Sequence, residues 1–314
     1  MQSVTLQNIT KTYDKGRVLA VDNVSLHIDR GELFGLIGPD GAGKTSVFRI
    51  LTTLLLADKG TASVNGFDVV KDYQAIRNRV GYMPGKFSLY QDLTVKENLH
   101  FFATLFGTGI EENYALIKDI YEQIRPFNNR RVGKLSGGMK QKLALCCALI
   151  HKPEVLFLDE PTTGVDVVSR REFWEMLKKL KQQGITILVS TPYMDEAVLC
   201  ERIALMQHGR IMSVDTPGNI IAAYPVKLYA MRSDNIYKLL NDLRKDEQVE
   251  SSYPFGEYLH VTLKTDGENK AAEWKSHIEK QGHTHVEVKP VAATIEDSFI
   301  RLMNEKKEQA FPHA

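Results

Sequence analysis

The stretch Gly38-Pro39-Asp40-Gly41-Ala42-Gly43-Lys44-Thr45 decides the fold of this 314-residue chain. It matches the pattern G-x-x-x-x-G-K-[ST], in which a glycine-rich loop surrounds phosphate groups with backbone N–H groups. Glycines are needed because side chains would keep the backbone away from the phosphates. The pattern places Lys44 to reach the β- and γ-phosphates of a nucleotide and the Thr45 hydroxyl to bind Mg²⁺.

The residues on either side of this loop predict a strand before it and a helix after it. Residues 32–37 read Glu-Leu-Phe-Gly-Leu-Ile, a short apolar run typical of a buried strand. From Gly43 to Leu56, apolar residues including Leu54 recur at helical spacing. The N-terminus of such a helix would point its dipole at bound phosphate. Strand, loop and helix in this order therefore indicate an α/β nucleotide-binding core.

The composition limits the class of protein. The chain carries 40 basic and 39 acidic residues, and this net charge of +1 argues against a dedicated nucleic-acid binder, which usually has a basic excess. Cys146, Cys147 and Cys200 lack the spacing of a disulfide framework or a metal site, which favours a reducing compartment. The sequence has no signal-peptide core and no apolar run of about 20 residues. We therefore expect a protein that is soluble by itself and reaches a membrane only through a partner.

Hydrophobic periodicity divides the chain into segments. Residues 1–30 alternate as strands do and predict an antiparallel sheet ahead of the phosphate-binding loop. From about 86 to 147 the pattern is helical, which predicts a helical insert between two halves of an α/β domain. The expected boundaries are a first domain at 1–222, an accessory domain at 226–308 and a frayed tail at 309–314.

The accessory domain shows the element order β-α-β-β-α-β followed by a helix. This order predicts a small α+β domain of split-βαβ type, and the segment carries no catalytic motif. Thr294 and Asp297 are expected to cap the last helix. His283 and His285 have no third metal ligand nearby, so we expect both to be surface residues.

Two further stretches carry residues suited to nucleotide chemistry. Residues 135–139, Leu-Ser-Gly-Gly-Met, open an apolar helix and form either a second anion-binding helix terminus or an ordinary turn. Residues 155–160 form an apolar run that ends in Asp159 and Glu160, as in a buried parallel strand with acids at its ligand-binding tip. Asp159 would then hold Mg²⁺ and Glu160 would polarise an attacking water. The alternative is an acidic turn at the end of a strand.

These three motifs, in this order and with a helical insert between them, resemble the ATPase subunit of ATP-binding cassette (ABC) transporters. The resemblance covers about residues 3–220. Residues 81–84, 135–141 and 194–197 are similar to the ATPase subunits of drug- and polysaccharide-type exporters with separate membrane subunits, and residues 294–299 are similar to the accessory tail of that group. The resemblance implies an α/β fold: a P-loop NTPase ABC cassette with a mixed sheet core, an N-terminal antiparallel β-subdomain and a helical insert, plus a small C-terminal α+β domain.

The resemblance also implies which residues bind ATP and Mg²⁺. The residues expected at the ATP of this chain are Tyr13, Gly38, Pro39, Asp40, Gly41, Ala42, Gly43, Lys44, Thr45 and Ser46. Tyr13 is either a partly exposed loop aromatic or a platform on which adenine stacks. Thr45 and Asp159 are the expected Mg²⁺ ligands, and Glu160 is the expected catalytic residue.

In the family, two cassettes face each other head to tail, and each covers the ATP of the other. The residues expected to contact the partner's ATP are Leu135, Ser136, Gly137, Gly138 and Gln141. Asp166 matches the loop that runs between the two sites. ATP joins the subunits and hydrolysis releases them, because the γ-phosphate contacts both halves.

Two positions depart from the family pattern. Gly85 stands where the family has a glutamine that touches Mg²⁺ and the attacking water. Pro192 stands where the family has a histidine that hydrogen-bonds the γ-phosphate, and proline has neither a side-chain donor nor a backbone N–H. Each lost transition-state contact can cost about a hundredfold in rate. We therefore expect a site that binds MgATP well and hydrolyses it slowly.

The resemblance implies a membrane permease subunit and a second cassette as partners, in a homodimer or a heterodimer, with no nucleic acid expected. The chain would then be cytoplasmic and peripheral, held at the inner face of the cell membrane by the permease. Two alternatives remain open: a soluble cassette ATPase acting on nucleic acid or ribosomes, and an ATP-gated regulatory subunit that does not hydrolyse. The sequence does not name a transported substrate.

Overall fold

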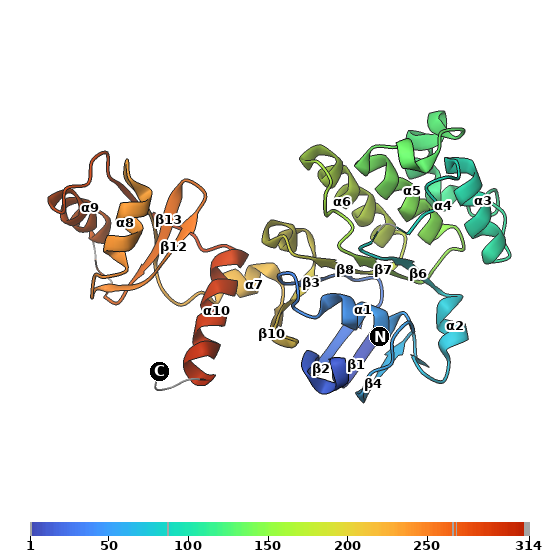
Figure 1. Cartoon of the computed structure of the whole chain (residues 1–314), viewed down its shortest axis with the longest axis horizontal. Coiled ribbons are helices and arrows are strands. Elements are labelled where there is room, and N and C mark those ends of the chain that lie inside the picture. The colour runs from blue at the N-terminus through green and yellow to red at the C-terminus, as the bar shows by residue number, and fades with distance from the viewer. Residues whose placement is uncertain (1, 87, 266, 268, 311–314) are drawn as a thin grey trace. The chain divides into compact units, whose positions relative to one another are not determined.

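The structure, a computed structural model, describes residues 2–86, 88–265, 267 and 269–310, with side chains described up to Asn304. Contacts divide the chain into two units, Met1–Gly218 with Glu305–Ala314, and Asn219–Asn304 (Figure 1). Of the tail expected at 309–314, residues 311–314 lie outside the described residues.

A six-stranded sheet forms the centre of the first unit, with strand order β10-β9-β3-β8-β7-β6. Its strands are β3 (Leu33–Ile37), β6 (Val80–Met83), β7 (Val155–Asp159), β8 (Thr186–Thr191), β9 (Arg202–Gln207) and β10 (Arg210–Asp215). Five strands run parallel, and β10 pairs antiparallel with β9. Every residue of β3, β7 and β8 is buried, as the apolar runs in the sequence predict. The carboxyl ends of these three strands therefore meet at one edge, where such sheets bind ligands.

The first unit also has an antiparallel sheet with strand order β2-β1-β4-β5. Two of its strands come before the phosphate-binding loop in the chain and two come after it. Its strands are β1 (Gln2–Tyr13), β2 (Val18–Asp29), β4 (Lys59–Val64) and β5 (Phe67–Asp68). One hydrophobic core joins it to the central sheet through the helix after the loop, where Phe48 meets Phe157 edge-on with ring centroids 6.1 Å apart. The mixed sheet core and the antiparallel subdomain are both as predicted.

The predicted helical insert is present. Its helices α3, α4 and α5 lie together beside α6 (Figure 1). The helices of the first unit are α1 (Lys44–Leu51), α2 (Tyr73–Arg77), α3 (Val95–Leu105), α4 (Tyr114–Ile124), α5 (Gly137–Leu149) and α6 (Val167–Gln182), and α7 (Pro217–Ala222) leads into the second unit. A capping box begins α3, because the Thr94 hydroxyl accepts from the Glu97 backbone N–H and the Glu97 carboxylate accepts from that of Thr94.

The helix after the phosphate-binding loop is shorter than the spacing predicts. It ends at Leu51 rather than Leu56, because the chain turns through Thr53, whose φ is +63°. Leu54 consequently lies outside the helix and is 56% exposed. Helical spacing alone could not reveal this turn.

The second unit has the predicted order of elements. They are β11 (Leu228–Arg232), α8 (Ile236–Leu243), β12 (Val249–Phe255), β13 (Tyr258–Leu263), α9 (Lys270–Lys280), β14 (Glu287–Val291) and the first part of α10 (Ile295–Ala310), up to Asn304. The strands form an antiparallel sheet in the order β12-β13-β11-β14, and apolar residues of α8 and α9 cover it. The expectation for His283 is wrong: its side chain is buried, with Nε2 3.0 Å from Asp242 Oδ2, whereas His285 is exposed.

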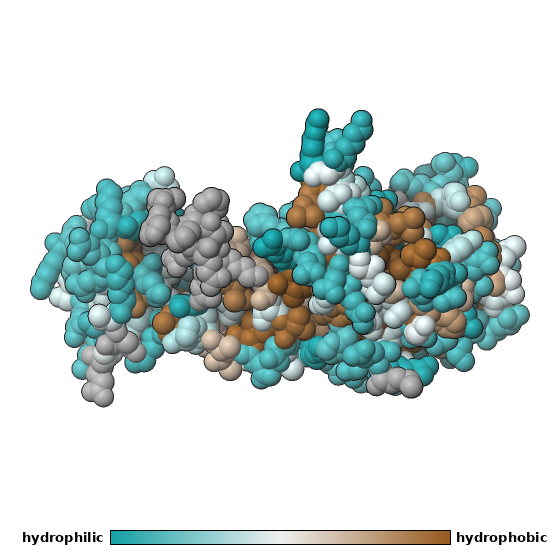
Figure 2. Space-filling model, turned by 90° about the horizontal axis from the view of Figure 1, so that it is seen from below, coloured by the Kyte–Doolittle hydropathy of each residue, from teal (hydrophilic) through white to brown (hydrophobic). Residues whose placement is uncertain are grey.

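Hydrophilic residues cover most of the face that Figure 2 shows, with smaller apolar patches between them. In the described part of the chain, no helix is both long and apolar enough to cross a membrane.

Candidate functional site

The glycine-rich loop connects β3 to α1 and is held close to neighbouring backbone. A Cβ on Gly38 would lie 2.1 Å from the Met206 carbonyl oxygen, and one on Gly43 would lie 2.2 Å from that of Ala20. Gly43 also has a φ of +105°, which other residues rarely adopt. Packing against neighbouring backbone therefore requires glycine at both positions, in addition to the close approach that bound phosphate needs. The first N–H groups of α1 have no partner within the helix and are available to an anion.

Lys44 joins the loop to the end of β7. Its side chain is 3% exposed, and Nζ donates to the carbonyl oxygens of Gly38 at 2.7 Å and Pro39 at 3.0 Å. The same Nζ lies 3.1 Å from Glu160 Oε1. The structure thus brings the loop lysine and the predicted catalytic carboxylate together, although 116 positions separate them (160 − 44). A buried cation is stable here because acceptors surround it.

The remaining loop residues are placed as follows. Ala42 and Ser46 are buried, and Asp40 is exposed. Tyr13, the last residue of β1, is 37% exposed, and its hydroxyl lies 3.1 Å from Ser46 Oγ. This contact puts an accessible aromatic ring beside the helix that leaves the loop.

The two predicted acids follow one another at the tip of β7 but lie in different surroundings. Asp159 is 2% exposed, and its Oδ1 accepts from Ser190 Oγ at 2.6 Å. Glu160 has a φ of +52°, an unusual value for a residue with a side chain. Its backbone N–H donates to both the carbonyl oxygen and the hydroxyl of Ser190, at 3.1 and 3.0 Å. Such strain is retained where surrounding contacts determine the geometry, and it is enriched at functional sites.

The residues present fit a divalent cation of the hard type. Asp159 Oδ2 accepts no hydrogen bond from the described residues, and Thr45, in the first turn of α1, carries the second oxygen ligand that the sequence suggests. Hydroxyl and carboxylate oxygens are the ligands that Mg²⁺ takes in phosphate sites. Burial and the charge of Asp159 raise the pKa of Tyr82 to about 12, so this neighbouring phenol stays neutral.

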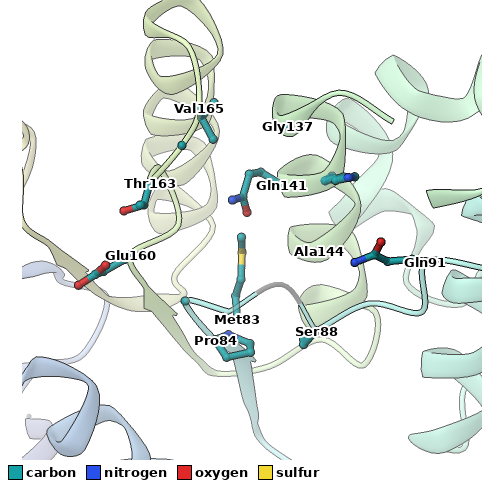
Figure 3. A pocket seen from close by; sticks show the side chains of 13 residues that line it. Met83, Pro84, Ser88, Gln91, Gly137, Gln141, Ala144, Glu160, Thr163 and Val165 are labelled. Atoms are coloured by element: carbon teal, nitrogen blue, oxygen red, sulfur yellow. The ribbon is translucent and has the colours of Figure 1, made fainter. Parts of the chain in front are cut away.

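Gly85 borders a cavity of about 240 Å³ between the central sheet and the helical insert (Figure 3). A Cβ on Gly85 would lie 3.1 Å from the Asp159 carbonyl oxygen and 3.7 Å from Asp159 Oδ2. The position of the first departure from the family pattern is therefore next to the predicted metal ligand. Pro192, the second, directly follows β8 and the buried Thr191.

Across this cavity lies the Ser-Gly-Gly turn, which begins α5 (Figure 3). Ser136 is its N-cap, and the hydroxyl accepts from the Met139 backbone N–H at 3.4 Å. Gly138 packs on α6, where an added Cβ would lie 2.6 Å from Ser169 Oγ. Within the described residues, no hydrogen bond joins residues 135–138 to residues 38–45. In the part of the chain that the structure describes, the turn therefore borders the same cavity as Glu160 but makes no hydrogen bond to the phosphate-binding loop.

Gln141 and Asp166 complete the predicted set. The Gln141 side chain points into the cavity toward Met83 (Figure 3), and its Oε1 is buried without a hydrogen-bond partner among the described residues. Asp166 is the N-cap of α6, where it accepts from the Ser169 backbone N–H at 3.0 Å, and this bond lowers the pKa of its carboxyl.

Sequence reasoning missed Ser190, Thr162, Arg170 and Glu196, which hydrogen-bond around the acids and the following loops. Residues 194–197 carry a resemblance to the family, but nothing in the sequence shows that Glu196 bonds to Thr162 and Arg170. Ser190 reaches the acids because β8 pairs with β7.

Known proteins with similar sequences identify the family. The profile described as "ABC transporter" matches residues 21–163. The chain is 38% identical over 305 residues to the "Probable multidrug ABC transporter ATP-binding protein YbhF" of Escherichia coli (strain K12), covering 96% of this chain but about half, 52%, of that protein. It is 35% identical over 306 residues to the "Nod factor export ATP-binding protein I" of Burkholderia lata, covering 95% of this chain and 96% of that protein.

A solved structure shares the fold of about two thirds of this chain. It is the "Dimeric structure of a post-hydrolysis state of the ATP-binding cassette MJ0796 bound to ADP and Pi", with a TM-score of 0.61 and 27% identity over 68% of this chain and 98% of that one. The chain therefore belongs to the ABC transporter family and is similar, within it, to the ATP-binding subunits of drug-exporter type.

Proposed function

We propose that this chain is the ATP-binding and ATP-hydrolysing subunit of an ABC-type membrane exporter. The observation that carries the proposal is the contact of Lys44 Nζ with Glu160 Oε1 at 3.1 Å, beside a loop in which Gly38 and Gly43 leave no room for a side chain. It unites a phosphate-binding cation with a carboxylate able to polarise water. Export, rather than another use of ATP, is supported by the names of the relatives.

ATP would be held by residues 38–46, with its adenine on the exposed ring of Tyr13 and Mg²⁺ on Thr45 and Asp159. The accessible Tyr13 ring beside Ser46 supports the first part. Asp159 Oδ2, to which no group among the described residues donates a hydrogen bond, supports the second. Glu160 would accept the proton of the attacking water, and Lys44 would stabilise charge on the phosphates. Bound Mg²⁺ would supply further charge neutralisation.

We infer that this site hydrolyses ATP slowly. Gly85 lies beside Asp159 but offers no carboxamide, and Pro192 offers no donor after β8. The groups that bind the phosphates are all present, because neither departure falls within residues 38–46. An ATP-gated subunit that does not hydrolyse at all is the second candidate, and the same two residues favour it.

We also infer that the Ser-Gly-Gly turn serves the ATP of a second cassette. The absence of hydrogen bonds between residues 135–138 and the chain's own loop, in the described part, supports this reading. A partner with a complete site would then hydrolyse most of the ATP, in a complex held at the membrane by a permease subunit. Co-purification from detergent-solubilised membranes, followed by an ATPase assay of the complex, tests the proposal. Recovery with RNA and no membrane protein would refute it.

Replacing Gly137 by aspartate is expected to lower hydrolysis by the assembled complex about a hundredfold, while the chain keeps its own ATP affinity. The fold should tolerate the change, since a Cβ there meets only the Gly164 carbonyl oxygen at 3.5 Å and an acid suits the N-terminus of α5. The added charge would repel the partner's γ-phosphate. ATPase rates of complexes carrying Gly137→Asp or the uncharged control Gly137→Ala check this, and equal rates would contradict it.

A further inference from the structure

Glu196 is the centre of a buried hydrogen-bond network outside the phosphate-binding loop. It belongs to the 3₁₀ helix Met194–Leu199 and is 2% exposed. Its Oε2 accepts from the hydroxyls of Thr162 at 3.0 Å and Thr191 at 2.5 Å, and its Oε1 accepts from Arg170 Nε at 3.1 Å. A carboxylate this deeply buried persists only when paired and hydrogen-bonded, so the three donors determine its position and it determines theirs.

The three donors come from three elements that border the candidate site. Thr162, 1% exposed, lies two positions after Glu160 in the loop that follows β7. Thr191 is the last residue of β8, and Arg170 lies in the first turns of α6. The Glu196 carboxylate therefore joins the loop after β7 and the end of β8 to α6.

Arg170 is itself fixed to the segment that follows Pro192. Its Nη2 lies 3.2 Å from Asp195 Oδ2, and its guanidinium lies over the Tyr193 ring at 4.3 Å from the centroid. The Tyr193 backbone N–H donates to Thr191 Oγ1 at 3.1 Å. The segment after β8 is thus held by protein contacts, and Pro192 provides no donor that a phosphate could engage in their place.

We propose that Glu196 is a positioning residue that sets the loop from Glu160 to Asp166 through its bond to Thr162. The inference rests on the proposed function, because it takes from that proposal the role of Glu160 in polarising the attacking water. Glu160 is held on one side by Ser190, which binds its backbone N–H, and on the other by the loop that Thr162 anchors. With its φ of +52°, Glu160 depends on both supports to keep its carboxylate near Lys44.

The test compares the full-length wild type with Glu196→Gln and Thr162→Val, both close to isosteric. The first readout is hydrogen exchange at the Thr163 and Val165 amides, which donate to the Glu160 and Thr162 carbonyl oxygens. The second is single-turnover hydrolysis with protein in excess over MgATP, alongside MgATP affinity. We expect about tenfold faster exchange at these amides and about tenfold slower hydrolysis, with affinity within about twofold of wild type.

Two controls separate positioning from general destabilisation. Thr162→Ser keeps the hydroxyl and should restore wild-type exchange and hydrolysis. Glu175→Gln removes an exposed carboxylate of α6 that pairs only with Lys178 among the described residues, and should change neither readout.

Unchanged exchange and hydrolysis in Glu196→Gln and Thr162→Val would overturn the inference, and so would a Thr162→Ser variant as impaired as Thr162→Val. If Glu196→Gln does not fold, Thr162→Val and Thr162→Ser decide the question. A wild-type chain that hydrolyses no ATP would overturn the proposed function instead, and the exchange measurements would still decide whether Glu196 sets the loop.

Discussion

Replacement of Lys44 by alanine is expected to weaken MgATP binding by about a hundredfold or more. The Lys44 amino group is the buried cation of the loop, and its contacts with Gly38 O, Pro39 O and Glu160 Oε1 lie between 2.7 and 3.1 Å. Its loss removes a charge-assisted contact to phosphate and leaves the Glu160 carboxylate without its cation. Titration of the purified full-length chain with a fluorescent ATP analogue measures the change.

The matched control is Lys179→Ala, which removes an exposed lysine whose side chain pairs with Asp119 on the surface. It should leave ATP affinity unchanged, because exposed ion pairs contribute little and neither residue of this pair contacts the loop among the described interactions. Unfolding midpoints should accompany both titrations. If Lys44→Ala folds and binds MgATP within threefold of wild type, the assignment of the loop is wrong.

Restoring the family's residues at both positions, with Gly85→Gln and Pro192→His in one variant, is expected to raise ATP hydrolysis by the chain about a hundredfold or more. The glutamine would supply a carboxamide beside Asp159, and the histidine would supply a donor after β8. A Cβ at residue 85 would lie 3.1 Å from the Asp159 carbonyl oxygen, so the backbone there must move by a few tenths of an ångström. ATP affinity should change little, since residues 38–46 are untouched.

The control for this gain is Gly85→Leu with Pro192→Ala. Leucine fills a volume similar to that of glutamine without a carboxamide, and alanine removes the proline ring without adding a donor. Phosphate-release assays on both variants separate the effect of the added carboxamide and imidazole from the effect of removing glycine and proline from the backbone. Equal rates for the restored and the control variants would show that the two missing side chains do not limit hydrolysis.

Much of the fold and part of the site follow from local sequence. The glycine pattern, the apolar run that ends in Asp159, and the helical insert each depend on residues close together in the chain, and each is present in the structure. The capping boxes at Thr94 and Thr294 are likewise local, and both form. Spacing and residue type are sufficient where the chemistry lies within one element.

The contacts that support the site could not be read in this way. Ser190 looks like any polar residue near a strand end, yet it holds both Asp159 and Glu160 because β8 pairs with β7. The bond between Thr162 and Glu196 spans 34 positions and depends on where two loops meet. The sequence predicts an exposed His283, because no local pattern reveals its partner Asp242, 41 positions earlier.

The most direct test of the central claim is ATP turnover by the purified chain alone, measured together with MgATP binding and compared with Glu160→Gln. The account predicts saturable MgATP binding by both proteins and turnover by the wild type that is slow, rising when a complete partner cassette and the permease are supplied. Rapid turnover by the chain alone that disappears in Glu160→Gln would contradict it, because Gly85 and Pro192 would then be no obstacle to hydrolysis.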